Sequence, residues 1–268
     1  MRQLTVTCLL LALCTALAAA ATEQEAAASL AQRIQQALGE RRNVCAVQEL
    51  RLTATLTVAS DKRDLDMAIA RQQLSAELAA GAASMVGADP ALQPPQLRAQ
   101  YIQAINAAMQ QFIQVINTSQ QEWSTQVNGA FQRLNQEEGN AHQTLNQALS
   151  TAQQSATTTL GGIPADVAPT IPEGMADLTG TVQTEEVITA AEKSIAEARA
   201  SYRDDLSKAL AQGYAELKAA VANTVPAERT ASIRSAVSRL RLVCLDRYDQ
   251  YNSEVRSILR KALLAALQ

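Results

Sequence analysis

The chain has 268 residues, with 23 basic and 26 acidic side chains and a formal charge of −3. Because acids are in excess, the composition excludes the strongly basic surface on which nucleic-acid binding depends. Aromatic residues make up only 3% of the chain, so alanine, leucine, isoleucine and glutamine must supply the packing surfaces, and alanine favours helix.

Residues 1–21 have the organisation of an export signal peptide. Arg2 supplies a positive start, Leu9–Leu13 and Ala16–Leu17 form a short apolar core, and alanines follow. This core is too short to span a bilayer, and no later segment of about 20 residues is predominantly apolar. We therefore expect a secreted, extracellular chain with a formal charge of −4, because cleavage removes Arg2 and no acid.

Prolines and glycines divide the rest of the chain into four blocks with helical periodicity. The blocks cover residues 22–86, 97–159, 185–224 and 228–267, and a linker rich in proline and glycine covers residues 160–182. This organisation predicts an all-α fold, an elongated antiparallel helical bundle that resembles a coiled coil and has very long helices. We expect residues 22–268 to form a single helical domain.

The first block combines helical and strand-like patterns. Apolar residues at four-residue steps from Leu30 to Leu38 are typical of one face of a helix. Residues 50–58 instead alternate apolar and polar side chains, which taken alone indicates a strand. A lone strand would have no partner among helical segments, so helix is the favoured interpretation. Ser60 or Asp61 is then expected to cap a further helix.

The second block contains no proline and carries a long apolar stripe. Its apolar positions recur mostly at steps of three and four, at Ile105, Met109, Phe112, Ile116, Trp123, Val127, Phe131, Leu134, Ala141, Leu145, Ala148 and Ala152. The mean repeat lies closer to 3.6 than to 3.5 residues, so the stripe follows an ordinary straight helix. Between Ala99 and Gln121 the block has no charge but many amides. Amides are costly in hydrocarbon, so this surface is expected to pack against other helices or another copy.

The third and fourth blocks repeat the helical pattern. The apolar face of the third comprises Ile188, Ala191, Ile195, Ala198, Tyr202, Leu206, Leu210, Gly213, Leu217 and Val221. That of the fourth comprises Ile233, Val237, Leu240, Cys244, Tyr248, Tyr251, Val255, Ile258, Ala262 and Ala266. From Val255 onward the fourth block is cationic and amphipathic. A last core helix is the favoured interpretation of this end, and a helix that lies on a lipid surface is the alternative.

Two cysteines remain after Cys8 and Cys14 leave with the signal peptide. They are Cys45 and Cys244, and two cysteines in an exported chain most simply pair. We therefore predict a disulfide bond between Cys45 and Cys244. Two free buried thiols, or a cross-link between molecules, are the alternative. Their spacing excludes a CxxC redox or zinc motif.

No group of residues has the pattern of a catalytic, cofactor-binding or metal site. His142 is the only histidine, whereas a metal site or a nucleophilic triad needs several converging groups. We expect His142 to be a partly exposed polar residue. Asn117 begins an Asn-Thr-Ser acceptor and is the candidate glycosylation site of a glycoprotein.

These observations predict a secreted, non-enzymatic helical protein that needs no cofactor and acts by binding or as a structural or interaction component. Its expected partner is another protein or a second copy of the chain, and nucleic acid is not expected. The alternative is an extracellular carrier of lipid or small apolar ligands of the amphipathic-helix type, which would contact lipid through its C-terminal helix.

Overall fold

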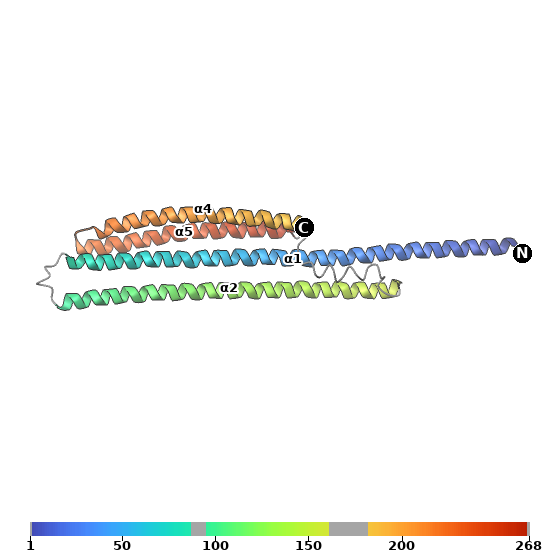
Figure 1. Cartoon of the computed structure of the whole chain (residues 1–268), viewed down its shortest axis with the longest axis horizontal. Coiled ribbons are helices and arrows are strands. Elements are labelled where there is room, and N and C mark those ends of the chain that lie inside the picture. The colour runs from blue at the N-terminus through green and yellow to red at the C-terminus, as the bar shows by residue number, and fades with distance from the viewer. Residues whose placement is uncertain (1, 87–94, 161–181, 267–268) are drawn as a thin grey trace. The chain divides into compact units, whose positions relative to one another are not determined.

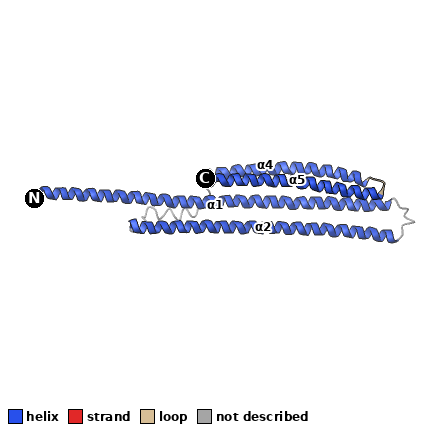
Figure 2. Ribbon diagram, turned by 180° about the vertical axis from the view of Figure 1, so that it is seen from behind, coloured by secondary structure: helices blue, strands red, loops and turns tan. Residues whose placement is uncertain are grey.

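The computed structural model describes residues 2–86, 95–160 and 182–266, which form four helices and contain no strand (Figures 1 and 2). Helix α1 spans Arg2–Val86, α2 spans Pro95–Leu160, α4 spans Val182–Val221 and α5 spans Pro226–Ala266. The predicted all-α helical bundle is confirmed, and the helices match the four predicted blocks closely at every end except the start of α1. Most of the predicted linker, residues 161–181, lies outside the described residues.

Helix α1 is continuous from Arg2 to Val86. It includes residues 50–58, so the helical interpretation of that segment is confirmed. No second helix begins at Ser60 or Asp61, and the predicted cap is wrong, because the Asp61 carboxylate accepts hydrogen bonds from side chains of α4 and α5. The expected signal peptide lies within the same helix, and its cleavage stays a prediction. Within the described ranges, no helix combines the length and the apolar character needed to cross a membrane.

Proline marks the start of two helices. Helix α2 begins at Pro95 and α5 at Pro226, and proline suits this position because the first N–H groups of a helix have no intrahelical acceptor. Between α4 and α5, the Val225 N–H donates to the Asn223 side-chain oxygen over 3.0 Å. The Arg229 guanidinium Nε donates to the Asn223 carbonyl over 2.6 Å. These bonds fix a short turn, so the two helices run antiparallel.

Contacts between Cα atoms divide the chain into two units, each built from segments of several helices. The first unit comprises the described parts of Met1–Leu50, Arg133–Thr189 and Ala262–Gln268. The second unit comprises the described parts of Arg51–Gln132 and Ala190–Lys261. The single domain expected from the sequence stays a prediction.

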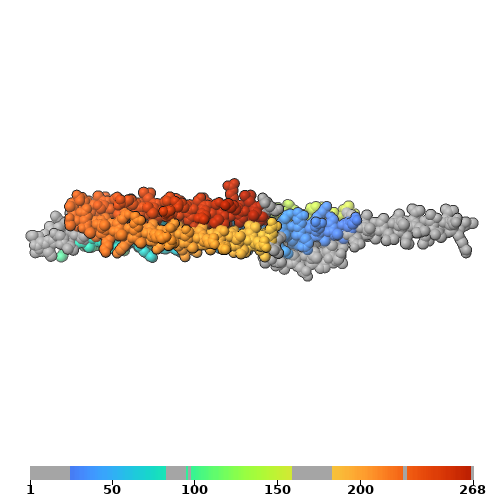
Figure 3. Space-filling view, turned by 90° about the horizontal axis from the view of Figure 1, so that it is seen from above, coloured from blue at the N-terminus to red at the C-terminus, as the bar shows by residue number. Residues whose placement is uncertain are grey.

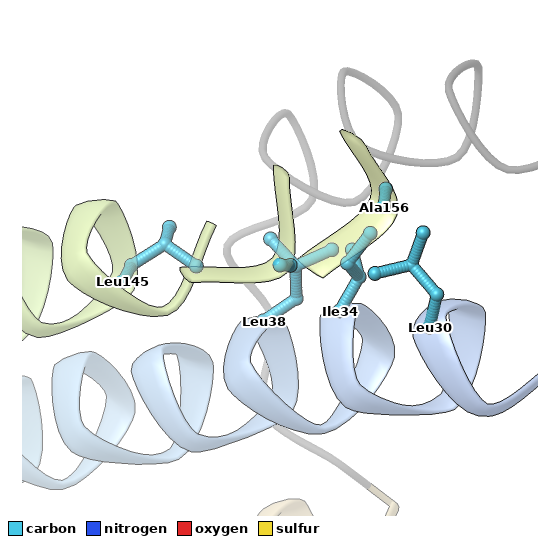
Figure 4. Packing of buried hydrophobic residues seen from close by; sticks show 6 residues of the cluster. Leu30, Ile34, Leu38, Leu145 and Ala156 are labelled. Atoms are coloured by element: carbon cyan, nitrogen blue, oxygen red, sulfur yellow. The ribbon is translucent and has the colours of Figure 1, made fainter. Parts of the chain in front are cut away.

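In the first unit, α1 and α2 pack through a small apolar core (Figure 4). Leu30, Ile34 and Leu38 from α1 are at most 5% exposed, and they meet Leu145 and Ala156 from α2. Short side chains on α2 let the two helices approach closely. The apolar pattern predicted for both helices is therefore confirmed in this unit.

In the second unit, α2 lies on one side of α1, and α4 and α5 lie on the other (Figures 1 and 2). Helices α4 and α5 run side by side along their length (Figure 3). Their predicted apolar faces are buried, with the largest side chains at Tyr202 and Leu217 on α4 and at Leu240, Tyr248 and Tyr251 on α5. Each of these two helices has one buried face, as the sequence predicts.

At Gly213, α4 lies close to the Leu240 side chain of α5. A Cβ atom added there would lie 2.5 Å from Leu240 Cδ1 and 3.0 Å from Leu240 Cγ. Leu240 is only 4% exposed, so its side chain has little room to move. The absence of a side chain at Gly213 therefore lets these helices meet.

We expect Gly213→Ala to lower the free energy of unfolding by about 1 kcal/mol, because the overpacking cost exceeds the gain in helix propensity. The matched control is Gly139→Ala on α2, where an added Cβ meets nothing within 4 Å. There the same change should raise stability by up to about 1 kcal/mol. Urea unfolding followed by circular dichroism measures both values. A stabilised Gly213→Ala variant would contradict the close approach.

Candidate interaction surface

A buried carboxylate joins three helices of the second unit. The Asp61 side chain on α1 is 3% exposed and accepts two hydrogen bonds of 2.8 Å from the Arg199 guanidinium on α4. Tyr251 Oη on α5 donates to it over 3.1 Å, and Arg203 Nη2 on α4 lies 3.4 Å away. Four donors saturate the acceptor positions of one carboxylate. The group is therefore a structural link that holds α4 and α5 on α1, with no position left for a ligand.

Three tyrosines surround this link. The rings of Tyr202 and Tyr251 stack with centroids 4.7 Å apart, and Tyr248 meets Tyr202 edge-on at 6.3 Å. Burial raises the pKa of Tyr248 to about 12, and burial together with the Asp61 charge raises the pKa of Tyr202 and Tyr251 further. All three hydroxyls are therefore protonated at neutral pH, which suits a packed core.

Polar contacts fix the rotation of α2 against α1 in the second unit. Ser119 Oγ donates to Asp66 over 3.2 Å, and Trp123 Nε1 donates to Ser60 Oγ over 3.3 Å. The Arg63 guanidinium also lies 5.0 Å from the centre of the Trp123 ring. The buried positions of α2 here are the small residues Ala108, Ser119 and Ala130. These contacts turn one face of α2 toward α1 and leave another face exposed.

The exposed face carries large apolar side chains. Ile102, Met109, Ile113 and Phe131 are between 42% and 56% exposed. These four residues and the residues between them on the same side follow one another at steps of three and four. They therefore share one face of the helix. We call this face the α2 outer face, and it comprises Ile102, Asn106, Met109, Ile113, Asn117, Gln120, Ser124, Val127 and Phe131. None of these nine side chains is charged.

The predicted stripe of α2 is thus correct only in part. Ala141, Leu145 and Ala152 are buried as expected in the first unit. In the second unit, Met109 and Phe131 are exposed, and that part of the prediction is wrong. The reason is that α2 carries two rows of apolar side chains in the second unit. Its hydrogen bonds to α1 turn the row with the smaller side chains toward α1.

The predicted disulfide bond is absent, since Cys45 and Cys244 are both free and buried. Cys45 lies on α1 in the first unit, and Cys244 lies on α5 in the second. Each thiol fills a place that a small apolar side chain would take. Burial raises the pKa of both thiols, which therefore stay protonated at neutral pH. The disulfide prediction is corrected to the alternative of two free buried thiols.

The other residues singled out from the sequence lie on α2. His142 is exposed, as expected. Asn117 is exposed inside the helix, and its glycosylation stays a prediction. The Asp61 link was not predicted, although Arg199 and Arg203 stand one helical turn apart on α4. Among the residues that the structure describes, no three His, Cys, Asp or Glu side chains are grouped so that they could hold a metal ion.

Comparisons of the chain with protein-family models, with curated proteins and with solved structures gave no match.

Proposed function

We propose that the protein acts outside the cell as a non-enzymatic helical interaction component, and that it pairs with a second copy through the α2 outer face. The observation that supports this proposal is the alignment of Ile102, Met109, Ile113 and Phe131, all exposed by 42% or more, on one face. Aligned apolar side chains of this size on a surface are typical of an interface. The extracellular location rests on the export signal expected in residues 1–21.

The chemistry of the face favours a second copy as the partner. Amide side chains both donate and accept hydrogen bonds, so a row of them is complementary to itself. With no charge from Ala99 to Gln121, two copies meet without like-charge repulsion. An antiparallel pair centred between Ile116 and Asn117 would place Ile102 of one copy opposite Phe131 of the other. Such a two-fold arrangement is the commonest form of homo-oligomer.

The test is the double variant Met109→Gln/Ile113→Gln, which removes two apolar side chains from each copy. We expect the native chain to be a dimer and the variant to pair roughly 1000-fold more weakly, since the dimer loses four large apolar side chains and burial of each contributes on the order of 1 kcal/mol. Sedimentation equilibrium over a range of concentrations measures the change. Circular dichroism should show the same helix content in both proteins, because both positions are exposed.

The matched control is Leu242→Gln on α5, since Leu242 is 68% exposed and lies on another helix. This variant should pair as the native chain does. A native chain that stays monomeric at every concentration would overturn the proposal. Equal weakening by Leu242→Gln would show that the α2 outer face is not the interface.

A further inference from the structure

A row of side chains on α1 adjoins the α2 outer face in the second unit. The row begins at Ser60, whose hydroxyl accepts a hydrogen bond from Trp123. Trp123 stands three residues after Gln120 and four before Val127, and both of these belong to the α2 outer face. From Ser60 the row follows α1 at steps of four and three, so its members share one side of the helix. We call this row the α1 flank, and it comprises Ser60, Asp64, Met67, Arg71, Leu74 and Leu78.

The α1 flank is less buried than the side of α1 that meets α4 and α5. On that other side, Leu65 and Ile69 follow Asp61 at steps of four and are 1% and 7% exposed. The apolar members of the α1 flank are instead half-buried, and they are Met67, Leu74 and Leu78. The α1 flank and the α2 outer face therefore form one surface with apolar side chains from two helices.

The two charged residues of the α1 flank have opposite signs. Asp64 is 55% exposed and makes a single contact of 3.4 Å with Arg63 of its own chain, so most acceptor positions of its carboxylate remain open. Arg71 is exposed and stands seven residues further along, on the same side of the helix. In a parallel pair of flanks, each charge would meet its own copy. In an antiparallel pair centred halfway between the two charges, each would meet the opposite charge.

The centre of these two charges matches the centre of the proposed α2 pair. The midpoint between the charges falls just after Met67. The proposed α2 pair is centred just after Ile116, between two and three residues before Ser119. Because Ser119 bonds to Asp66 and the two helices run antiparallel, that centre lies between two and three residues beyond Asp66 on α1. The two centres therefore differ by about one residue along α1.

We infer that the second copy covers the α1 flank as well as the α2 outer face, so that Asp64 of each copy forms an ion pair with Arg71 of the other. Met67 and Leu74 of the two copies then lose contact with water around the same two-fold axis. This inference rests on the proposed pairing, to which it adds a second helix and an orientation. The charges oppose a parallel pair, in which Asp64 would face Asp64.

Charge reversal tests the orientation, with sedimentation equilibrium of the full chain as the measurement. Asp64→Arg and Arg71→Asp should each weaken pairing about tenfold, because each turns two attractive contacts of the dimer into repulsive ones. The double variant Asp64→Arg/Arg71→Asp exchanges the charges and should pair as strongly as the native chain. An equimolar mixture of the two single variants should also pair at native strength, since every contact between unlike variants joins opposite charges.

Two further variants test the extent of the surface. Met67→Gln removes a half-buried apolar side chain from each copy and should weaken pairing about tenfold. Arg51→Asp is the matched control, since Arg51 is an exposed cation of α1 outside the α1 flank, and it should leave pairing unchanged. Circular dichroism of each variant identifies loss of folding. The double charge variant has the native composition, so its recovery separates a contact between copies from a folding defect.

Three outcomes would overturn the inference. They are native pairing by both single charge variants, no recovery in the double variant or the mixture, and equal weakening by Arg51→Asp and Arg71→Asp. If any of these occurs while Met109→Gln/Ile113→Gln still weakens pairing, the α2 outer face remains the interface and only the α1 flank is removed from it. A native chain that is monomeric at every concentration would overturn both proposals.

Discussion

Arg199→Met should lower the free energy of unfolding by about 3 kcal/mol, because it leaves the Asp61 carboxylate buried without its two shortest hydrogen bonds. The Asp61 side chain is 3% exposed, so water cannot replace the lost guanidinium. Only Tyr251 and the more distant Arg203 would remain as donors. Chemical unfolding followed by circular dichroism measures the loss.

Arg203→Met is the matched control for this prediction. Arg203 is 59% exposed and contacts Asp61 at 3.4 Å, so its removal should cost less than about 1 kcal/mol. The double variant Asp61→Leu/Arg199→Met removes both charges and should recover much of the lost stability. Equal losses for the two arginine variants, or no recovery in the double variant, would contradict the assignment of Asp61 as the link between the helices.

Alkaline pH should unfold the second unit by ionising its tyrosines. The pKa of Tyr248 rises from 10.0 to about 12 on burial, and the pKa values of Tyr202 and Tyr251 also rise. In the unfolded chain these hydroxyls ionise first, so their contribution to stability is complete below pH 10 and falls as the pH rises above it. For Tyr248 alone, two pKa units correspond to a loss of roughly 2 to 3 kcal/mol by pH 12.

Urea unfolding at a series of pH values measures this loss, and tyrosinate absorbance reports ionisation in the same samples. The Cys244 thiol of the second unit acts in the same direction from about pH 9 upward, because burial also raises its pKa from 9.0. Tyr248→Phe provides the control, since it removes one ionising group and should make stability less dependent on pH above 10. A native chain whose stability is constant from pH 10 to 12 would refute the buried tyrosine cluster.

The sequence predicts the helices of this protein well, and the faces of α4 and α5 in particular. Each of those helices has a single apolar face, so the spacing of residues such as Ile195 and Tyr202, or Leu240 and Tyr251, identifies the buried side directly. Residues 50–58 show the limit of a local pattern. Their alternation is typical of a strand, yet packing on neighbouring helices buries a helical set of positions there.

The buried face of α2 could not be predicted to the same degree. Helix α2 carries two apolar lines, and periodicity alone does not say which of them meets α1. Hydrogen bonds from Ser119 and Trp123 decide this, and they depend on the register between helices far apart in the sequence. The Asp61 link depends on register in the same way. The spacing of residues along the sequence does not give the register between helices that are distant in the sequence.

The position of Asn117 one helical turn beyond Ile113 has a consequence for how the protein could be regulated. Residues four apart on a helix point the same way, so a carbohydrate attached to Asn117 would stand in the middle of the surface proposed to receive a second copy. A sugar of that size and an approaching helix exclude each other. Under the proposed pairing, a chain glycosylated at Asn117 would therefore stay a single molecule, and a chain with a bare Asn117 would pair.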